Sequence, residues 1–472
     1  MPYPYTKINE THIAYLKAVT DPARVYEKER IQEEYYHDEM PEYGVYPPDV
    51  LVEVLTKEEV SAIMRYAYEN NIPVVARGAG TGLAGGATAK YGGIMISMMK
   101  MNRIIGIDKE NLSITVQPGA LLSEVAAAAA ENGLFYPPDP GEKTASIGGT
   151  VITNAGGMRA VRYGVTRDYV RSIEAVLPDG EIVNFSSNVV KNTTGFDIKD
   201  LIIGSEGILC VLTQVTLKLI PAPNCTRTLL VPFDNIETCV ETVPKILQSH
   251  LVPTAIELIE ADLLEVVERT LGKHFPDSSG EAYLIVMFDA NSLPEIEKDC
   301  DDAAQICMEA GALDVLFCDT EERIGSVWSV RGAVLEGMKA DTTSEEECDV
   351  VVPRSKIAEF VKAAKEIASR HHVRIMTVGH AGDGNIHTEI LRDQLTDEEW
   401  KNATKEILKE LYKKSKELGG QMSGEHGIGN GRLEYLEDFV GSRMYQLYRS
   451  IKLAFDEKNI LNPGKMITFD HD

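Results

Sequence analysis

The stretch RGAGTGLAGG at residues 77–86 follows the apolar run IPVVA at residues 72–76 and holds five glycines in ten residues. Glycine accepts positive φ angles and lets backbone N–H groups approach a ligand closely. A glycine-rich turn that leaves a strand is therefore suited to hold phosphate oxygens, and Arg77 at its start favours an anion further. The sequence predicts a phosphate-binding loop here, with a glycine-rich surface turn as the plainer alternative.

Gly80, Gly82 and Gly85 also match GxGxxG, the pattern of nicotinamide-binding βαβ units. Only ATAKYGG separates Gly86 from the next strand-like run, IMISM at residues 94–98. This spacing is too short for a crossover helix, and no acidic residue ends the second run where a ribose-binding carboxylate would lie. We therefore expect a strand, a phosphate loop and another strand.

Composition limits the partners. The 472 residues predict two or three domains, and the formal net charge of -26 argues against nucleic acid or anionic lipid, which would repel such a chain. No apolar run is long enough to span a membrane and the first residues lack a signal-peptide core, so we expect a cytoplasmic protein. Seven scattered cysteines without CxxC argue against an iron–sulfur cluster or a zinc knuckle.

The changes in composition and in the pattern of apolar runs along the chain predict an α+β protein in four parts. Residues 1–45, rich in Tyr, Glu and Asp, are expected to form an arm with helical patches such as residues 24–36. Residues 46–223 form a first domain, in which Thr56 caps a helix and Asp179-Gly180 turns a hairpin. Residues 224–420, with strands and helices in turn, form a separate α+β domain. Residues 421–472 are expected to return to the first domain.

A second group of polar residues lies in GHAGDGNIH, where His380 and His387 flank a tight turn between two strand-like runs. A hairpin would place both imidazoles on one side, and Glu425 in SGEHGIG would add a carboxylate. Two imidazoles and a carboxylate suit Zn²⁺, Fe²⁺ or Mn²⁺ with positions left open for a chelating substrate. His426 would then address the substrate. The alternative is that these histidines close turns through hydrogen bonds.

Seven motifs taken in order resemble one family. They are RGAGTGLAGG, PPDPGEKTASIGGTVITNAGG, RYGVTRDYV, KNTTGFDIKDLIIGSEGIL, GHAGDGNIH, SGEHGIG and LNPGK, spread from Arg77 to Lys465. Together they resemble the FAD-linked D-2-hydroxyacid dehydrogenases, which include the flavoprotein subunit of glycolate oxidase and D-lactate dehydrogenases of the vanillyl-alcohol-oxidase type. The resemblance covers nearly the whole chain. It implies a two-lobed FAD-binding domain of the vanillyl-alcohol-oxidase/PCMH type and an α+β cap domain with an antiparallel sheet.

The resemblance also implies which residues hold FAD. The glycine loop would hold the pyrophosphate through Arg77, Gly78, Ala79, Gly80, Thr81, Gly82 and Gly85. Two later motifs would hold the flavin, the first through Pro138, Asp139, Ser146, Gly148, Gly149 and Asn154 and the second through Glu206, Gly207 and Ile208. The loop lacks the histidine by which related enzymes tether the cofactor, so FAD should be bound non-covalently.

By the same resemblance, His380, His387 and Glu425 bind a divalent metal ion and His426 is the catalytic base. Arg331 in VWSVRGAVLEGM matches the family's carboxylate-binding arginine, whose guanidinium can fork onto a carboxylate. The metal would chelate the hydroxyl and carboxylate of a 2-hydroxy acid and lower the pKa of the hydroxyl. His426 would take the hydroxyl proton as hydride leaves for the flavin. A surface-exposed helical arginine is the alternative for Arg331.

Departures from the family pattern narrow the substrate. Leu335, Glu347 and Glu389 fall where the 2-hydroxyglutarate members carry Thr, Lys and Asn. A second carboxylate would therefore meet apolar or acidic groups, which favours a short monoacid, lactate first and glycolate second.

The reduced flavin must pass its electrons to a partner, because the chain shows no cluster or nicotinamide site. Members of the family pass electrons to iron–sulfur subunits, to quinone or to an electron-transfer flavoprotein. An acidic chain without a membrane element favours a soluble partner, and we expect a lactate dehydrogenase subunit of an electron-transfer-flavoprotein complex, of which some perform electron bifurcation. Three alternatives stay open: a glycolate or D-2-hydroxyglutarate dehydrogenase with another acceptor, a non-redox alkylglycerone-phosphate synthase, and a non-catalytic flavin relay subunit.

Overall fold

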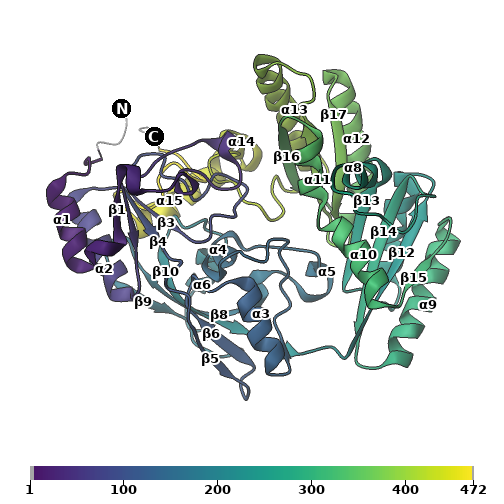
Figure 1. The fold of residues 1–472 in the computed structure, drawn as a ribbon, viewed down its shortest axis with the longest axis horizontal. Coiled ribbons are helices and arrows are strands. Elements are labelled where there is room, and N and C mark those ends of the chain that lie inside the picture. Colours follow the sequence, from purple (N-terminus) through teal and green to yellow (C-terminus); the bar gives the residue numbers. More distant parts are fainter. Residues whose placement is uncertain (1–4, 470–472) are drawn as a thin grey trace. The chain divides into compact units, whose positions relative to one another are not determined.

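The computed structural model describes residues 5–469. Contacts divide the chain into two compact units (Figure 1). Unit 1 consists of Met1–Ala155, Val165–Ala222 and Glu425–Asp472, and unit 2 consists of Gly156–Gly164 and Pro223–Gly424. Each unit combines sheets with helices, so the α+β prediction is confirmed. The short segment Gly156–Gly164, which the sequence analysis assigned to the first domain, belongs to unit 2.

The first lobe of unit 1 is built on a four-stranded sheet in the order β1-β2-β4-β3. Its strands are β1 (Val25–Glu27), β2 (Val50–Glu53), β4 (Ile94–Ser97) and β3 (Val74–Arg77). The central strand β4 runs parallel to both β2 and β3. The connection from β3 to β4 contains no helix, so the predicted order of strand, loop and strand is confirmed.

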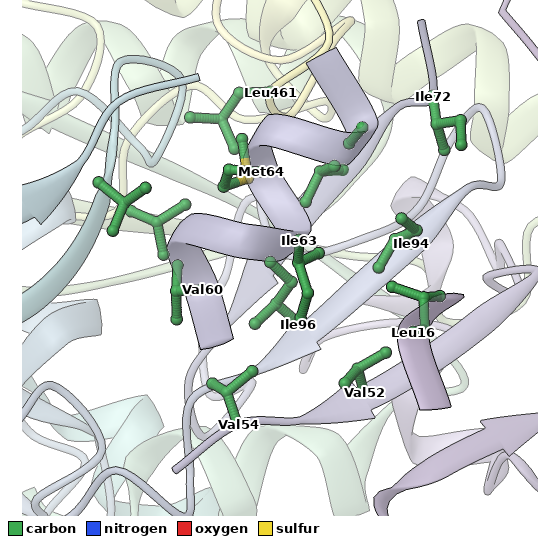
Figure 2. Close-up of a cluster of buried hydrophobic side chains, with 14 of the residues drawn as sticks. Leu16, Val52, Val54, Val60, Ile63, Met64, Ile72, Ile94, Ile96 and Leu461 are labelled. Carbon is green, nitrogen blue, oxygen red and sulfur yellow. The ribbon is translucent and has the colours of Figure 1, made fainter. Parts of the chain in front are cut away.

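The core of this lobe draws on both ends of the chain (Figure 2). Helix α2 (Lys57–Asn70) begins where Thr56 accepts a hydrogen bond from the Glu59 N–H, as predicted, and buries one face against the sheet. Leu16 on α1 (Glu10–Val19) and Leu461 near the carboxyl end are fully buried in the same cluster. Burial of such side chains contributes about 1.5–3 kcal/mol each, so the amino-terminal residues are part of the core.

The helical patch expected at residues 24–36 is wrong. The structure has β1 there, which pairs with β2, and short 3-10 turns, η2 (Lys28–Arg30) and η3 (Glu33–Tyr35). The backbone carbonyls of Glu34 and His37 accept hydrogen bonds from the Arg77 guanidinium. Long-range pairing therefore overrides the local helical propensity.

The second lobe of unit 1 is a five-stranded antiparallel sheet in the order β5-β6-β10-β8-β9. Its strands are β5 (Ile104–Asp108), β6 (Ser113–Val116), β10 (Val211–Lys218), β8 (Val170–Val176) and β9 (Ile182–Phe185). Strands β8 and β9 form the hairpin predicted at Asp179-Gly180. The alanine-rich helix α3 (Leu122–Glu131) and the short helices α4 (Ile147–Thr153) and α6 (Ile198–Ile202) complete the lobe.

The carboxyl-terminal residues belong to unit 1, where Leu461 forms a parallel bridge with Val74 beside β3. Helices α14 (Leu433–Val440) and α15 (Ser442–Phe455) precede this bridge. The buried Lys452 ammonium on α15 donates to the carbonyls of Ile208 and Leu461 and to Asp456. All three donors of a fully buried lysine are thereby used, which fixes the tail to the rest of the unit.

Unit 2 is organised on a seven-stranded antiparallel sheet in the order β15-β12-β14-β13-β17-β18-β16. The strands are β15 (Leu316–Cys318), β12 (Cys225–Phe233), β14 (Ala282–Ala290), β13 (Ala255–Glu260), β17 (Arg374–His380), β18 (Asn385–Leu391) and β16 (Glu345–Val351). Three helices pack on the face that carries Ile259, Ile285 and Val378: α8 (Ala261–Leu271), α10 (Glu321–Arg331) and α11 (Val334–Asp341). Helices α7 (Ile236–Gln248), α9 (Leu293–Ala310), α12 (Ile357–His371) and α13 (Asp397–Glu417) also pack against the sheet.

The structure contains neither a disulfide among the seven cysteines nor, within residues 5–469, a membrane-crossing helix. All seven cysteines are free thiols. Among residues 5–469, no helix has the length and apolar character that a membrane crossing requires.

Candidate active site

The loop that follows β3 presents unused backbone donors. Within residues 5–469, none of the N–H groups of residues 78–82 donates a hydrogen bond to the protein. A Cβ on Gly78 would lie 2.1 Å from Ser146 Oγ, and Gly80 has a φ of 80°. The backbone path therefore requires glycine at both positions. Several N–H groups without protein partners in one glycine-rich turn fit a bound phosphate group.

Arg77 has a role that the sequence did not indicate. Its buried guanidinium donates to the backbone carbonyls of Glu34, His37 and Ala87 and lies over the Tyr35 ring. Burial lowers the pKa of this guanidinium. The Arg77 side chain thus supports the loop from the amino-terminal residues, and a contact between its charge and FAD remains a prediction.

The short helix α4 lies beside the glycine loop. Ser146 caps it by accepting a hydrogen bond from the Gly149 N–H at 3.3 Å. A Cβ on Gly148 would lie 2.7 Å from Pro118 Cβ, so the helix packs too closely there for any side chain. Asn154 ends the helix in the left-handed conformation, with a φ of 51°. Three of the predicted flavin contacts therefore also have a structural role in helix α4: Ser146 caps it, Gly148 allows its close packing and Asn154 ends it.

The remaining predicted FAD contacts are placed as follows. Pro138 is buried, and Asp139 forms an ion pair with Lys143 four residues on. Gly207 has a φ of 71° and Ile208 is buried. Their contact with the cofactor remains a prediction.

Glu206 connects two motifs that are far apart in the sequence. Its carboxylate accepts the N–H groups of Ile428 at 2.7 Å and Gly429 at 2.6 Å. A Cβ on Gly427 would lie 2.8 Å from Glu206 Oε1. Burial raises the pKa of the Glu206 carboxyl, although the two N–H groups oppose that rise. Glu206 therefore holds the segment that follows His426 against the GSEGI motif within unit 1.

Lys465 is a buried cation in unit 1 that the site prediction did not include. Its ammonium donates to the Thr88 carbonyl at 2.8 Å. Burial, with a smaller effect of Lys90, lowers the pKa of Lys465 to about 7. A lysine is almost never fully buried unless it is paired, so the burial is informative, but it could not be predicted from the sequence.

In unit 2, the predicted hairpin is confirmed. His380 ends β17 and His387 lies on β18, and the two imidazole rings are 5.4 Å apart between centroids at 89° to each other. Val378 faces His387 and His380 faces Asn385 in the register of the hairpin. Both histidines therefore point to the same face of the sheet, because alternate residues share a face.

Each histidine has a carboxylate at its Nδ1 atom. Glu257 on β13 lies 2.8 Å and 2.9 Å from His380 Nδ1 through its two oxygens. Glu347 Oε1 on β16 lies 2.6 Å from His387 Nδ1. An Nδ1–H that His380 donates to Glu257 makes Nε2 the ligand atom of that ring, which is the usual arrangement of metal-binding histidines. The donor set therefore fits a divalent cation.

Arg331 is placed beside the same carboxylate. It ends helix α10 and lies 2.8 Å through Nη2 and 3.0 Å through Nε from Glu257 Oε2. Burial opposes ionisation of Glu257, but His380 and Arg331 outweigh it and hold the pKa of the carboxyl below its ordinary value. Arg331 is thus a partly buried, ion-paired residue and not a surface-exposed helical arginine.

Asp349 connects β16 to the residues that precede Glu425. Its buried carboxylate accepts the side-chain amide of Asn385 at 2.8 Å, the Ser423 hydroxyl at 2.7 Å and the Gly424 N–H at 3.1 Å. Asp349 also faces His387 in the strand register. Asp349 therefore fixes the last residues of unit 2, and the peptide bond after Gly424 leads to Glu425.

Glu425 and His426 themselves are the first residues of the last segment of unit 1. His426 Nε2 lies 3.6 Å from Glu425 Oε1. Their roles as metal ligand and base remain predictions.

Glu347 and Glu389, which favour a substrate with one carboxylate, lie on the sheet face that carries His380 and His387, here called the histidine face. Glu347 and Glu389 are directly opposite each other on β16 and β18, two residues from the pair of Asp349 and His387. Both glutamates are buried. Leu335 on α11 packs against the apolar cluster of the same sheet face. Leu335, Glu347 and Glu389 therefore offer a ligand carboxylate only apolar or acidic side chains and no basic one.

The chain matches two family models. The model described as "FAD binding domain" matches residues 48–186, and that described as "FAD linked oxidases, C-terminal domain" matches residues 222–466. Among curated relatives, "D-lactate dehydrogenase" of Anaerostipes hadrus is 45% identical over 469 residues, which cover 98% of both chains. "Glycolate oxidase subunit GlcD" of Bacillus subtilis is 37% identical and covers 92% of both.

Solved structures show the same fold at low identity. A structure of p-cresol methylhydroxylase with substrate bound superposes with a TM-score of 0.83 at 18% identity, covering 100% of this chain and 99% of that one. The 4-ethylphenol oxidase of Gulosibacter chungangensis gives a TM-score of 0.80 at 17% identity, with 99% of each chain covered. The predicted vanillyl-alcohol-oxidase/PCMH type of fold is thereby confirmed.

Proposed function

Because this chain belongs to the family of FAD-linked oxidases, we propose that it is an FAD-dependent dehydrogenase of short D-2-hydroxy acids, with D-lactate as the first candidate substrate and glycolate as the second. The names of the relatives support this substrate class, since they include D-lactate dehydrogenases and glycolate oxidase subunits. The observation that carries the proposal is the pair of histidines on one sheet face, where Glu257 contacts both His380 and Arg331 and Glu347 lies beside His387.

The residues of the chain divide the work. The Arg331 guanidinium binds the substrate carboxylate, and its pairing with Glu257 fixes its orientation. His380, His387 and Glu425 would hold a divalent cation, Fe²⁺, Zn²⁺ or Mn²⁺, which would act as a Lewis acid and lower the pKa of the substrate hydroxyl. His426 accepts the hydroxyl proton as the C2 hydrogen leaves as hydride. Non-covalently bound FAD supplies the hydride acceptor, and the product is a 2-oxo acid.

The charge on the histidine face supports a monoacid. Glu347 and Glu389 would repel the second carboxylate of a substrate such as 2-hydroxyglutarate. At about 4 Å and an effective dielectric constant of 20, one such repulsion costs about 4 kcal/mol. Lactate and glycolate avoid this cost because they carry one carboxylate.

The electrons then pass to a partner protein. The seven cysteines contain no CxxC and all are free, which supports an external acceptor. We propose a cytoplasmic electron-transfer flavoprotein, or an iron–sulfur subunit, that docks with an acidic chain of net charge -26. Electron bifurcation would be a property of that complex.

The test is an anaerobic titration of the purified flavoprotein with D-lactate, L-lactate, glycolate and D-2-hydroxyglutarate, before and after chelation. We expect D-lactate to bleach the flavin absorbance fully, glycolate to do so at higher concentration, and chelation to abolish both effects. Bleaching by L-lactate alone would reject the stereochemistry. Full bleaching after complete metal removal would reject the role of the cation.

A further inference from the structure

We propose that Glu257 is a positioning residue that couples the two halves of substrate recognition, because its single carboxylate orients both the Arg331 fork and the His380 ring. The inference rests on the proposed function for the ligands involved, and on unit 2 alone for its geometry. Glu257 was not among the predicted site residues, since it lies in the run AIELIE at the middle of a strand.

Burial is the first support for this role. The Glu257 side chain is completely inaccessible to solvent. A buried carboxylate without partners would cost several kcal/mol, so the charge requires Arg331 and His380 in their observed places. Glu257 and Arg331 together are neutral. The contact of His380 Nδ1 with this carboxylate fixes the orientation of the imidazole ring.

The way the contacts are divided is the second support. Arg331 uses Nε and Nη2 on Oε2, while Nδ1 of His380 lies near both oxygens. Within residues 5–469 the Arg331 guanidinium has no other partner, and Nη1 is left for a ligand oxygen. Glu257 on β13 therefore fixes the Arg331 guanidinium, which would bind an anion, and the His380 imidazole, which would bind a cation, relative to each other. A 2-hydroxy acid chelate needs both, because its carboxylate must meet the arginine and the metal together.

The consequence is a coupling between two binding events. If Glu257 becomes Gln, the side chain has one acceptor oxygen where the carboxylate has two, so Arg331 and His380 must share that oxygen and an N–H₂ group takes the place of the other. The positive charge of Arg331 is then no longer neutralised beside a cation site. Both the affinity for metal and the affinity for the substrate carboxylate should fall in this one variant.

The first readout is the tautomer of His380 in the metal-free protein, measured from the ring ¹⁵N shifts of histidine-labelled protein and assigned with His380→Gln. Wild type should show a protonated Nδ1, and Glu257→Gln should lose this signature. The second readout is the affinity for Mn²⁺ and Zn²⁺ by calorimetry. Loss of a carboxylate behind a ligand histidine typically costs about 10–100-fold in metal affinity, and we expect that range here.

Arg331→Met separates the two halves. It should keep the Nδ1–H signature and at least wild-type metal affinity, while the KM for D-lactate rises at least about tenfold for loss of a charge-assisted pair. Glu260→Gln is the matched control, because Glu260 lies on the same strand and pairs with Lys365 instead. It should change neither readout. Circular dichroism and a thermal melt establish that each variant is folded, and Glu257→Asp, which keeps the charge on a shorter side chain, should recover part of the metal affinity.

Wild-type metal affinity together with an unchanged His380 tautomer in folded Glu257→Gln would overturn the inference. If Glu257→Gln does not fold, an Arg331→Met protein that lacks the Nδ1–H signature would overturn it equally. The proposed function fails separately, if D-lactate does not reduce the flavin of the wild-type protein. The tautomer readout does not depend on that outcome.

Discussion

Replacement of Asp349 by Asn tests whether the hydrogen bonds of this carboxylate to Ser423 and Gly424, here called the clamp, position Glu425 and His426. The carboxylate receives three donors, the Ser423 hydroxyl and the Gly424 N–H on Oδ2 and the Asn385 amide on Oδ1. An asparagine must turn an N–H₂ group toward one of these donors. At least one hydrogen bond to a charged group is then lost, which amounts to about 1.5–3 kcal/mol.

The loss of stability should be accompanied by a loss of catalytic rate. Gly424 is joined directly to Glu425, and a displacement of about 1 Å at a reacting group can lower a rate about 100-fold. We therefore expect the rate of flavin reduction at saturating D-lactate to fall by about 10–100-fold in Asp349→Asn, measured by anaerobic stopped-flow absorbance. The KM should change little, because the contacts of Arg331 are not altered.

Two further variants make the result interpretable. Ser423→Ala removes one of the three donors and leaves the carboxylate, so its rate should lie between wild type and Asp349→Asn. Asp393→Asn is the control, since Asp393 pairs with Arg374 at the exposed far end of the same hairpin. A wild-type rate in Asp349→Asn, with stability lowered as estimated by urea unfolding, would show that the clamp does not position the reacting residues.

Three other outcomes are expected. Lys452→Met should destabilise unit 1 by about 3–5 kcal/mol in urea unfolding, because Asp456 loses its buried countercharge. Lys465→Met should change the pH dependence of stability. The pKa of Lys465 is about 7 in the folded state and 10.5 in the unfolded state, so the folded state binds fewer protons between these pH values. In the wild-type protein this lysine therefore makes the free energy of unfolding rise with pH, by up to about 1.4 kcal/mol per pH unit. The stability of the wild-type apoprotein relative to that of apo Lys465→Met should therefore increase from pH 7 to pH 10, and a constant difference would contradict the lowered pKa. Gly80→Ala should weaken FAD binding to the apoprotein at least about tenfold by fluorescence titration, since φ is 80° and the new Cβ would lie 2.1 Å from Arg77 Nη2; unchanged affinity would mean that the loop does not hold the cofactor.

The sequence was informative where local pattern determines structure. The strand before the glycine loop, the absence of a helix after it and the hairpin between His380 and His387 all follow from residue spacing. The two histidines share a face because of the two-residue period of strands. The order of the seven motifs identified the family before any coordinates were needed.

Partners at long range could not be predicted. Arg77 is bound by backbone carbonyls of residues 34 and 37, and every residue has a carbonyl, so no pattern marks them. Asp349 meets Ser423 and Gly424 more than 70 residues further along the chain. Glu257 stood out only as a charge within an apolar strand, a position where full burial is rare without a partner.

The charges around the two histidines give an independent argument for a cation. From unit 2, Glu257, Glu347 and Asp349 lie within 4 Å of the imidazole rings, at 2.8, 2.6 and 3.9 Å from Nδ1 atoms. Arg331 pairs with Glu257, so two negative charges remain if the imidazoles are neutral. Buried charges in excess are costly, and this group can be neutralised either by bound protons or by one divalent cation. Because the ligand nitrogens must be deprotonated to bind metal, the two solutions compete, and a site that binds a dication at neutral pH needs this excess of carboxylates to favour the metal.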